Sequence, residues 1–174
     1  VYTAGNIIGN FTRWFGATGA KAFPLGIATA SGTTVAKNYA LVTISTLGTA
    51  GSLTASFITS PPGILGFPLT ESSVTLLNTF PDGYWSFVPT TLVSTNYALE
   101  LNGTDFTTFS QDPSMRIVKR LIVTSAWTLS GTHVAAVPPT AKRSAISGFG
   151  QFALATACAK VDAGPDQHHN NSTF

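Results

Sequence analysis

The sequence predicts an all-β protein, an antiparallel β-sandwich of the Ig-like or jelly-roll-like kind with little or no helix. Apolar residues alternate with period two along most of the chain and rarely recur at the spacing of an amphipathic helix. Thr, Val, Ile, Phe, Tyr and Trp dominate these runs, and such residues fit a pleated, half-buried surface. Glycines end the runs at intervals of roughly 8–12 residues, which is the strand-plus-turn spacing of a sandwich or barrel.

Eleven strands are expected in chain order. The third shows the alternation most clearly, because Tyr39, Leu41 and Thr43 share one of its faces. Gly48 and Gly51 give the short link to the fourth strand the glycine content of a hairpin. The expected strands run over residues 10–15, 20–28, 37–47, 51–59, 72–79, 83–88, 95–102, 114–120, 125–130, 132–137 and 145–157.

Prolines and glycines mark the other connections. Pro61-Pro62-Gly63 breaks the sheet, and the stretch from there to about Glu71, with Phe67-Pro68-Leu69 inside it, is expected to be a long loop. Loops of this length are often functional or are packed by their own side chains. Pro81-Asp82-Gly83 is a tight turn, because Pro presets φ and Gly accepts a positive φ. Ser130-Gly131 is expected to join the two strands on either side of it as a second hairpin.

The composition is that of one folded domain with a weakly charged surface. The chain has 174 residues, of which 44% are apolar and 9% charged, and its net charge is +2. These values exclude charge-driven disorder and a clustered basic face for nucleic acid. No apolar run reaches the length of about 18 residues that a transmembrane helix needs. We expect a single sandwich domain over residues 1–163, with an extended segment over about 1–9 and a linker-like tail over 164–174.

Nothing in the sequence predicts an enzyme or a cofactor. The Gly-x-Ser-x-Gly elbow of hydrolases is absent, and His133 has no Asp or Glu beside it in sequence that would orient a general base. His133 is therefore expected to be a half-exposed strand residue. A calcium site built from Asp105, Asp112 and loop carbonyls remains an alternative. Cys158 is the sole cysteine, which excludes an internal disulfide and favours a buried apolar role. The missing initiator Met indicates a mature product or a piece of a longer precursor.

The aromatic residues favour a packed core over a binding platform. Large rings in dense apolar strands are expected inside a sandwich, because each buries a large apolar area. An alternative is a sugar-stacking platform that would expose Trp14 together with rings of the later strands. The residues predicted for the core are Trp85, Phe87, Trp127, Phe149 and Phe152.

Several short motifs in the second half of the chain carry a resemblance. They are Tyr84-Trp85-Ser86-Phe87, Arg116-Ile117-Val118-Lys119-Arg120, Trp127-Thr128-Leu129, Gly131-Thr132-His133-Val134, Ser147-Gly148-Phe149 and Asp162-Ala163-Gly164-Pro165-Asp166. In this order they resemble a β-sandwich module of large secreted and cell-surface proteins of Bacteroidetes-type bacteria. The resemblance implies an architectural module and an extracellular or cell-surface location.

The predicted function is self-assembly into a surface filament or similar polymer, with copies of the chain joined head-to-tail. Low charge makes association electrostatically cheap, and an added strand satisfies a whole row of backbone groups at a sheet edge. The alternative is a carbohydrate-binding or adhesive module of a larger secreted protein, with surface glycans as its partners. The sequence does not choose between a filament, a sheath and a bead in a long adhesin. The residues predicted to make the assembly contacts are Val1, Tyr2, Thr3, Ala4, Gly164, Pro165, Asp166 and Phe174.

Overall fold

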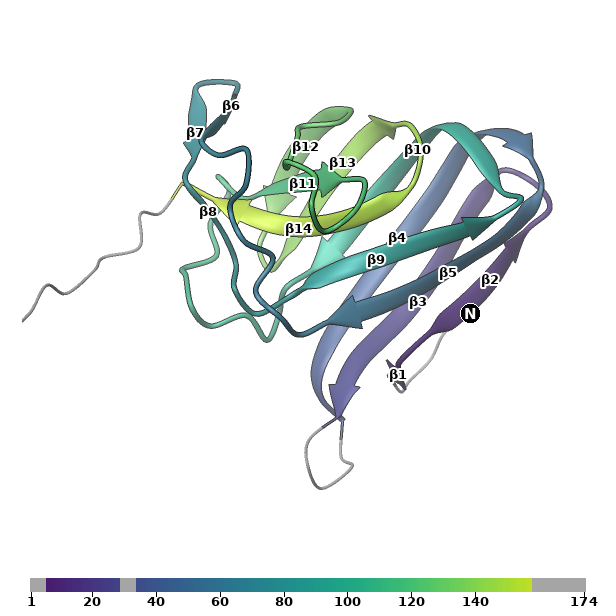
Figure 1. Cartoon of the computed structure of the whole chain (residues 1–174), viewed down its shortest axis with the longest axis horizontal. Coiled ribbons are helices and arrows are strands. Elements are labelled where there is room, and N and C mark those ends of the chain that lie inside the picture. Colours follow the sequence, from purple (N-terminus) through teal and green to yellow (C-terminus); the bar gives the residue numbers. More distant parts are fainter. Residues whose placement is uncertain (1–5, 29–33, 158–174) are drawn as a thin grey trace, which may run out of the picture.

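The structure, a computed structural model, describes residues 6–28 and 34–157. Every regular element in this part of the chain is a β-strand, and two sheets pack face to face (Figure 1). The all-β, sandwich-like fold predicted from the sequence is therefore confirmed. The strands are β1 (Ile7–Ile8), β2 (Phe11–Phe15), β3 (Gly19–Ala28), β4 (Thr34–Thr49), β5 (Gly51–Ile58), β6 (Leu69–Glu71), β7 (Val74–Leu76), β8 (Asn78–Thr79), β9 (Tyr84–Thr90), β10 (Val93–Asn102), β11 (Arg116–Arg120), β12 (Thr132–Val137), β13 (Thr140–Ile146) and β14 (Gly150–Thr156).

Each of the two large sheets contains six strands in the described part of the chain. The first sheet has the strand order β1-β3-β4-β10-β13-β12, and the second has the order β11-β14-β9-β5-β2, with β8 added beside β14. All pairs are antiparallel except the short β1–β3 pair, which is parallel. Strands β6 and β7 form a small hairpin that is a separate two-stranded sheet (Figure 1).

The core fills the space between the two sheets, because alternate residues of each strand point inward. Phe23 of the first sheet meets Phe87 of the second edge to face, with ring centroids 5.7 Å apart. The indole nitrogen of Trp85 donates a hydrogen bond of 2.9 Å to the carbonyl oxygen of Asn38 and so ties the second sheet to the first. Phe149 stacks on Tyr97 with ring centroids 4.8 Å apart. A buried donor that finds a partner avoids the cost of an unpaired polar group, so Trp85 supplies packing without a polar penalty.

All five aromatic residues predicted for the core are buried, but Trp127 is not between the sheets. Trp85, Phe87, Phe149 and Phe152 belong to the inter-sheet core. Trp127 is 1% exposed and belongs to a second, smaller cluster. That cluster also contains Tyr84 and Val118, whose side chains leave the second sheet on its outer face, so the sandwich has an additional layer there.

Three of the predicted strands differ from the structure: one does not form, and two are divided. Residues 125–130 form no strand, and a single bridge between Thr128 and Lys119 is what remains of it, so Ser130-Gly131 does not close a hairpin. The expected strand 145–157 is two strands in different sheets, β13 and β14. Ala145, with a φ angle of 53°, lies at an irregularity within β13, and the chain leaves the first sheet after Ile146, which still pairs with Tyr97. Gly148, with a φ angle of 62°, then breaks the extended conformation before β14.

The expected strand 72–79 is also divided. Ser72 and Ser73 have φ angles of 50° and 65°, the left-handed values at both central positions that a tight two-residue hairpin of type I′ requires. They turn the chain between β6 and β7, and β8 follows as a separate short strand. Sequence reasoning missed this hairpin because Ser-Ser is a weak turn signal beside Asn-Gly or Asp-Gly.

Candidate functional site

The outer face of the second sheet has two halves with different surroundings. One half, over β11, β14 and the start of β9, lies under residues 59–68 and the β6–β7 hairpin. The other half, over β2, β5 and the end of β9, carries no such layer in the described part of the chain. We call these the covered half and the bare half.

Arg120 holds the covered half together. Its guanidinium lies 4.3 Å from the ring centroid of Trp127 and 5.0 Å from that of Tyr84. It donates hydrogen bonds of 2.8 Å to the carbonyl of Pro62 and 2.7 Å to the side-chain oxygen of Gln151. Cation–π contacts gain strength when the cation is desolvated, and Arg120 is 4% exposed. One of the attachments of this long loop to the sheet is therefore a buried arginine.

The path of this loop depends on a glycine. Gly66 has φ of +94°, and a Cβ atom there would lie 2.9 Å from the carbonyl oxygen of Trp127. The backbone nitrogen of Trp127 donates to the carbonyl of Leu65 at 2.8 Å, and its indole nitrogen donates to Gly63 at 3.1 Å. The loop thus meets Trp127 through backbone as well as side-chain contacts, which makes it a structural cover.

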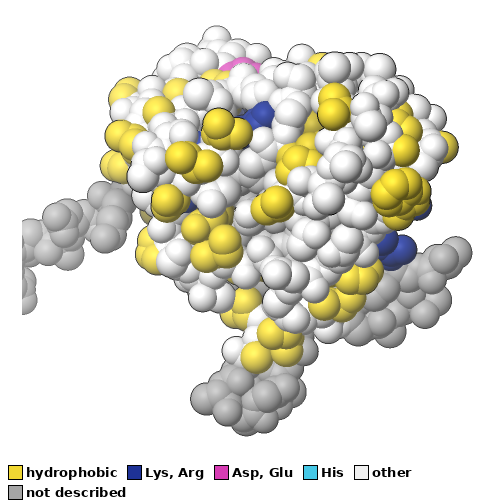
Figure 2. Space-filling view, turned by 45° about the vertical axis from the view of Figure 1, so that its right-hand side comes forward, with side chains coloured by type: hydrophobic (Ala, Val, Ile, Leu, Met, Phe, Trp, Pro, Cys, Tyr) yellow, Lys and Arg dark blue, Asp and Glu magenta, His cyan; other side chains and the backbone are white. Residues whose placement is uncertain are grey.

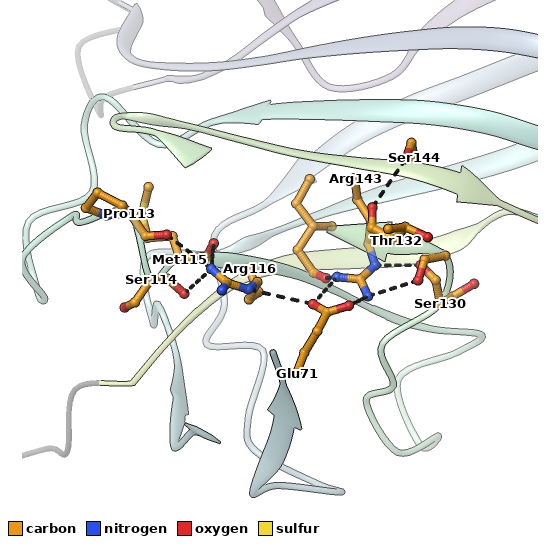
Figure 3. A network of polar contacts seen from close by, with 11 residues as sticks. Glu71, Pro113, Ser114, Met115, Arg116, Ser130, Thr132, Arg143 and Ser144 are labelled. Carbon is orange, nitrogen blue, oxygen red and sulfur yellow. Dashed lines mark hydrogen bonds and ion pairs between the residues drawn. The ribbon is translucent and has the colours of Figure 1, made fainter. Parts of the chain in front are cut away.

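A buried charge network joins the β6–β7 hairpin to the strands beneath it (Figure 3). The carboxylate of Glu71 accepts hydrogen bonds from Arg143 at 2.6 and 3.0 Å and lies 3.7 Å from Nε of Arg116. Arg143 is fully buried and also donates to the carbonyls of Ser130 and Gly131. A bidentate pair of this kind satisfies both the carboxylate and the guanidinium. The carboxylate is therefore engaged in contacts that hold the hairpin to the strands.

His133 lies beside this network on β12. It is directly opposite Arg143 across the β12–β13 pair, and its Nδ1 atom is buried without a hydrogen-bond partner. Burial lowers the pKa of His133 below its usual value, the nearby Arg116 and Arg143 lower it further, and Glu71 opposes them. The side chain is half-buried, as predicted from the sequence. Long-range folding brings Glu71 near it, which no local motif could indicate, yet Glu71 is committed to Arg143.

The bare half carries mostly small hydroxyl side chains. In register across β2, β5 and β9, one row is Trp14, Ser52 and Thr90. The next row is Thr12, Thr54 and Val88, in which the two threonine hydroxyl groups are 2.8 Å apart. Neighbouring strands are about 4.8 Å apart, so each row spans about 10 Å. These six residues include no ionisable side chain.

An apolar groove lies where the bare half meets the start of β14. It has a volume of about 490 Å³ and is lined on its sides by Val88, Leu121, Ile122, Phe149 and Gln151, among others. It exists because β14 begins late: Gly150 pairs with Phe87, so no strand in the described residues lies beside residues 88–90 on the side away from β5. The backbone edge of β9 is therefore open along one wall of the groove.

Several large apolar side chains next to this groove are exposed to solvent. Leu121, Ile122 and Val123 are 70%, 55% and 60% exposed, and Val88 is 57% exposed. Single exposed apolar residues are ordinary on protein surfaces, whereas a contiguous group beside a concavity is a candidate interaction surface. Figure 2 shows one face of the molecule, on which yellow apolar side chains are scattered over a largely white surface with few charged side chains.

The carboxylates considered for calcium serve other contacts. Asp112 accepts a hydrogen bond from the backbone nitrogen of Ser114 at 2.6 Å, as an Asp does in a tight turn. In the described residues no three His, Cys, Asp or Glu side chains gather as a metal-binding group. The same part of the chain contains no helix that is both long and apolar enough to cross a membrane.

The remaining predicted residues fall elsewhere. Val1, Tyr2, Thr3 and Ala4, then Cys158, and then Gly164, Pro165, Asp166 and Phe174, lie outside the described residues. The groove and the bare half were not assigned from the sequence. The run Leu121-Ile122-Val123 was the available signal, because three large apolar residues directly follow the predicted strand 114–120.

Comparisons with protein-family models, with curated proteins and with solved structures find no match for this chain. The resemblance to Bacteroidetes-type surface modules thus stays a prediction from motif order.

Proposed function

We propose that this chain is a non-enzymatic structural module of the extracellular space or cell surface that assembles with copies of itself. The observation that carries the proposal is the apolar groove beside the open backbone edge of β9. An extended segment of a neighbouring copy would pair with residues 88–90 in line with β14 and place alternate side chains into the groove. Backbone pairing supplies affinity in this mode of recognition, and the pocket supplies selectivity.

The energetics favour a protein partner at this position. Burying a Leu, Ile or Val side chain fully is worth roughly 1.5–3 kcal/mol, and three such side chains lie together in residues 121–123. None of the residues that line the groove is ionisable, and the amino group of Lys119 beside it already donates to the carbonyl of Gly148 at 2.7 Å. Open strand edges are usually blunted by lysine or proline. Here Pro89 is one of the three edge residues and has no backbone donor, so pairing would rest on the remaining backbone groups of the edge and on the groove.

The position of the groove favours head-to-tail contact. It lies at the first residue of β14, while the chain leaves β14 at Thr156. A strand of seven residues is about 23 Å long at about 3.3 Å per residue. The tail over residues 164–174 and the segment over residues 1–4 are the candidate donors to another copy that the sequence predicts. A donor and an acceptor that are different surfaces make a heterologous contact, which builds a ring or an open fibre.

The proposal is tested by charging the groove. Leu121→Lys combined with Ile122→Lys should give a folded protein that sediments as a monomer at concentrations where the natural chain assembles. Val137→Lys, which charges an equally exposed residue on the edge strand β12, is the matched control and should assemble normally. A natural chain that is monomeric at every concentration overturns the proposal, and assembly lost with Val137→Lys alone moves the interface to β12.

The donor is identified by truncation. Removing residues 1–5 and, separately, residues 164–174 leaves every described strand in place. The truncation that removes the donor should give a monomer with an unchanged melting temperature. If both truncated proteins assemble as the full chain does, the terminal donors are excluded.

A further inference from the structure

We infer that the bare half of the second sheet binds a neutral polysaccharide chain, with Trp14 as its stacking surface. This inference does not rest on self-assembly. Its starting point is the contrast among the three tryptophans: Trp85 and Trp127 are 0% and 1% exposed, whereas Trp14 is 60% exposed. An indole has one of the largest apolar surfaces of any side chain, and leaving it in water on a small domain forgoes a large burial energy.

The indole of Trp14 lies along the protein surface. Its nitrogen and Cδ1 approach Gly16 so closely that a Cβ atom at that position would be 3.1 and 3.7 Å from them. The ring edge is therefore packed over the backbone of the turn that follows β2, which limits the orientations available to it. A ring held in place offers a ligand a flat apolar surface at little further entropic cost.

The hydroxyl rows next to Trp14 suit a sugar chain. Ser52 and Thr90 continue the row of Trp14, and Thr12 and Thr54 lie in the next row. A hydroxyl group both donates and accepts hydrogen bonds, as sugar hydroxyls do. The contact between the hydroxyl oxygens of Thr12 and Thr54, 2.8 Å, fixes the spacing of that row before a ligand arrives.

The cations near this face are turned away from it, which favours a neutral ligand over an anionic one. Arg13 alternates with Thr12 and Trp14 on β2, and its Nε donates to the carbonyl of Ala22 at 3.2 Å while its guanidinium lies 5.0 Å from the ring centroid of Phe11. The amino group of Lys21 lies 5.6 Å from the ring centroid of Phe15. An acidic polysaccharide would need such groups to face it.

Away from the groove, this face does not suit a second protein. The buried centre of a protein interface is apolar, with aromatic residues and few small hydroxyl side chains. In the two rows Trp14 and Val88 are the large apolar residues, and Ser and Thr make up the rest. Sugar rings combine an apolar face with a hydroxyl rim, so a single stacking residue among hydroxyl groups matches their chemistry.

The test uses the full chain and the fluorescence of its tryptophans. Because two of the three indoles are buried, acrylamide quenching reports mainly on Trp14. Soluble hydroxyethyl cellulose, dextran and mannan are the neutral probes, and polygalacturonate is the anionic comparator. We expect at least one neutral probe to protect Trp14 from quenching and to retard the protein in affinity electrophoresis.

Variants separate binding from folding. Trp14→Ala should weaken binding roughly tenfold or more and leave the melting temperature unchanged, because the ring is exposed. Trp14→Phe should restore part of the affinity, and Thr54→Val should weaken binding by a smaller factor. Leu121→Lys with Ile122→Lys should bind the probe as the natural chain does, which distinguishes this site from the assembly groove.

Three results would overturn the inference. They are failure of every neutral probe to protect Trp14, equal binding by Trp14→Ala, and stronger binding of polygalacturonate than of any neutral probe. Protection of Trp14 by raised protein concentration alone would assign the face to contacts between copies and would also overturn it.

Discussion

The covered and bare halves of the second sheet share strand β9 and differ in what lies over them. On β9, Tyr84 lies under Arg120 and is 6% exposed, whereas Val88, on the same face four residues later, is 57% exposed. Strand propensity and alternation are alike at the two positions. The difference comes from residues 59–76, which reach one half and not the other. Whether an outward strand residue is core or surface is thus decided by a distant segment of the chain.

The largest expected effect compares one tryptophan from each half. Trp127→Ala should reduce the free energy of unfolding by about 3–5 kcal/mol, because it removes a buried ring, its hydrogen bond to Gly63 and the contact with Arg120. Trp14→Ala should change it by less than about 0.5 kcal/mol. Urea titration of both variants measures the two values. Equal losses would contradict the division of the sheet into two halves.

The next effect concerns the charge network that anchors the cover. Glu71→Ala should destabilise the protein by about 3 kcal/mol, because Arg143 and Arg116 stay buried without their carboxylate. Glu100→Ala, which removes the exposed pair with Lys142, is the matched control and should cost at most about 1 kcal/mol. Thermal unfolding of both variants gives the comparison. A Glu71→Ala loss no larger than the control would mean that the network does not hold the hairpin.

A smaller effect is expected at the glycine under the loop. Gly66→Ala should cost about 1–3 kcal/mol, because φ of +94° is strained for alanine and its Cβ would meet Trp127. Gly63→Ala has a positive φ of 73° but nothing within 4 Å of the added atom, so it isolates the backbone strain. Hydrogen exchange of the amide of Trp127 should accelerate more in Gly66→Ala than in Gly63→Ala. The reverse order would contradict the close contact.

The smallest effect is a pH dependence from His133. Its folded pKa lies below the unfolded value of about 6.5, so the unfolded chain binds more protons as the pH falls. The stability is fully present above about pH 6.5 and should decline as the pH falls through the folded pKa. The groups that face the imidazole are Arg116, Arg143 and Glu71. Chemical denaturation between pH 7 and about pH 5 should show a shallower decline in His133→Gln, and an identical decline would exclude His133 as its source.

Local physics made the fold class predictable and left the outer layer unpredictable. Alternation along residues 51–58 and 84–87 placed Trp85 and Phe87 inward, because a strand has two faces and one must be buried. Trp127 could be recognised as buried but could not be assigned to a layer. Its ring packs against Arg120, and a charged residue in a strand does not indicate in the sequence that an aromatic ring covers it. The groove depends on β14 beginning three residues short of the end of β9. Local sequence does not show where one strand begins relative to the end of its neighbour, so the groove could not be predicted.

The lack of ionisable groups along the groove and the bare half has a consequence for the setting in which the protein works. Contacts made there are not weakened by counterions, so binding should be nearly the same in fresh water and in brine. These regions supply no charges of their own for electrostatic steering, and the net charge of the chain is only +2, so we expect partners to meet near the unsteered rate of about 10⁵–10⁶ M⁻¹s⁻¹. Such a surface associates more slowly than a charged one, and its binding affinity depends little on salt.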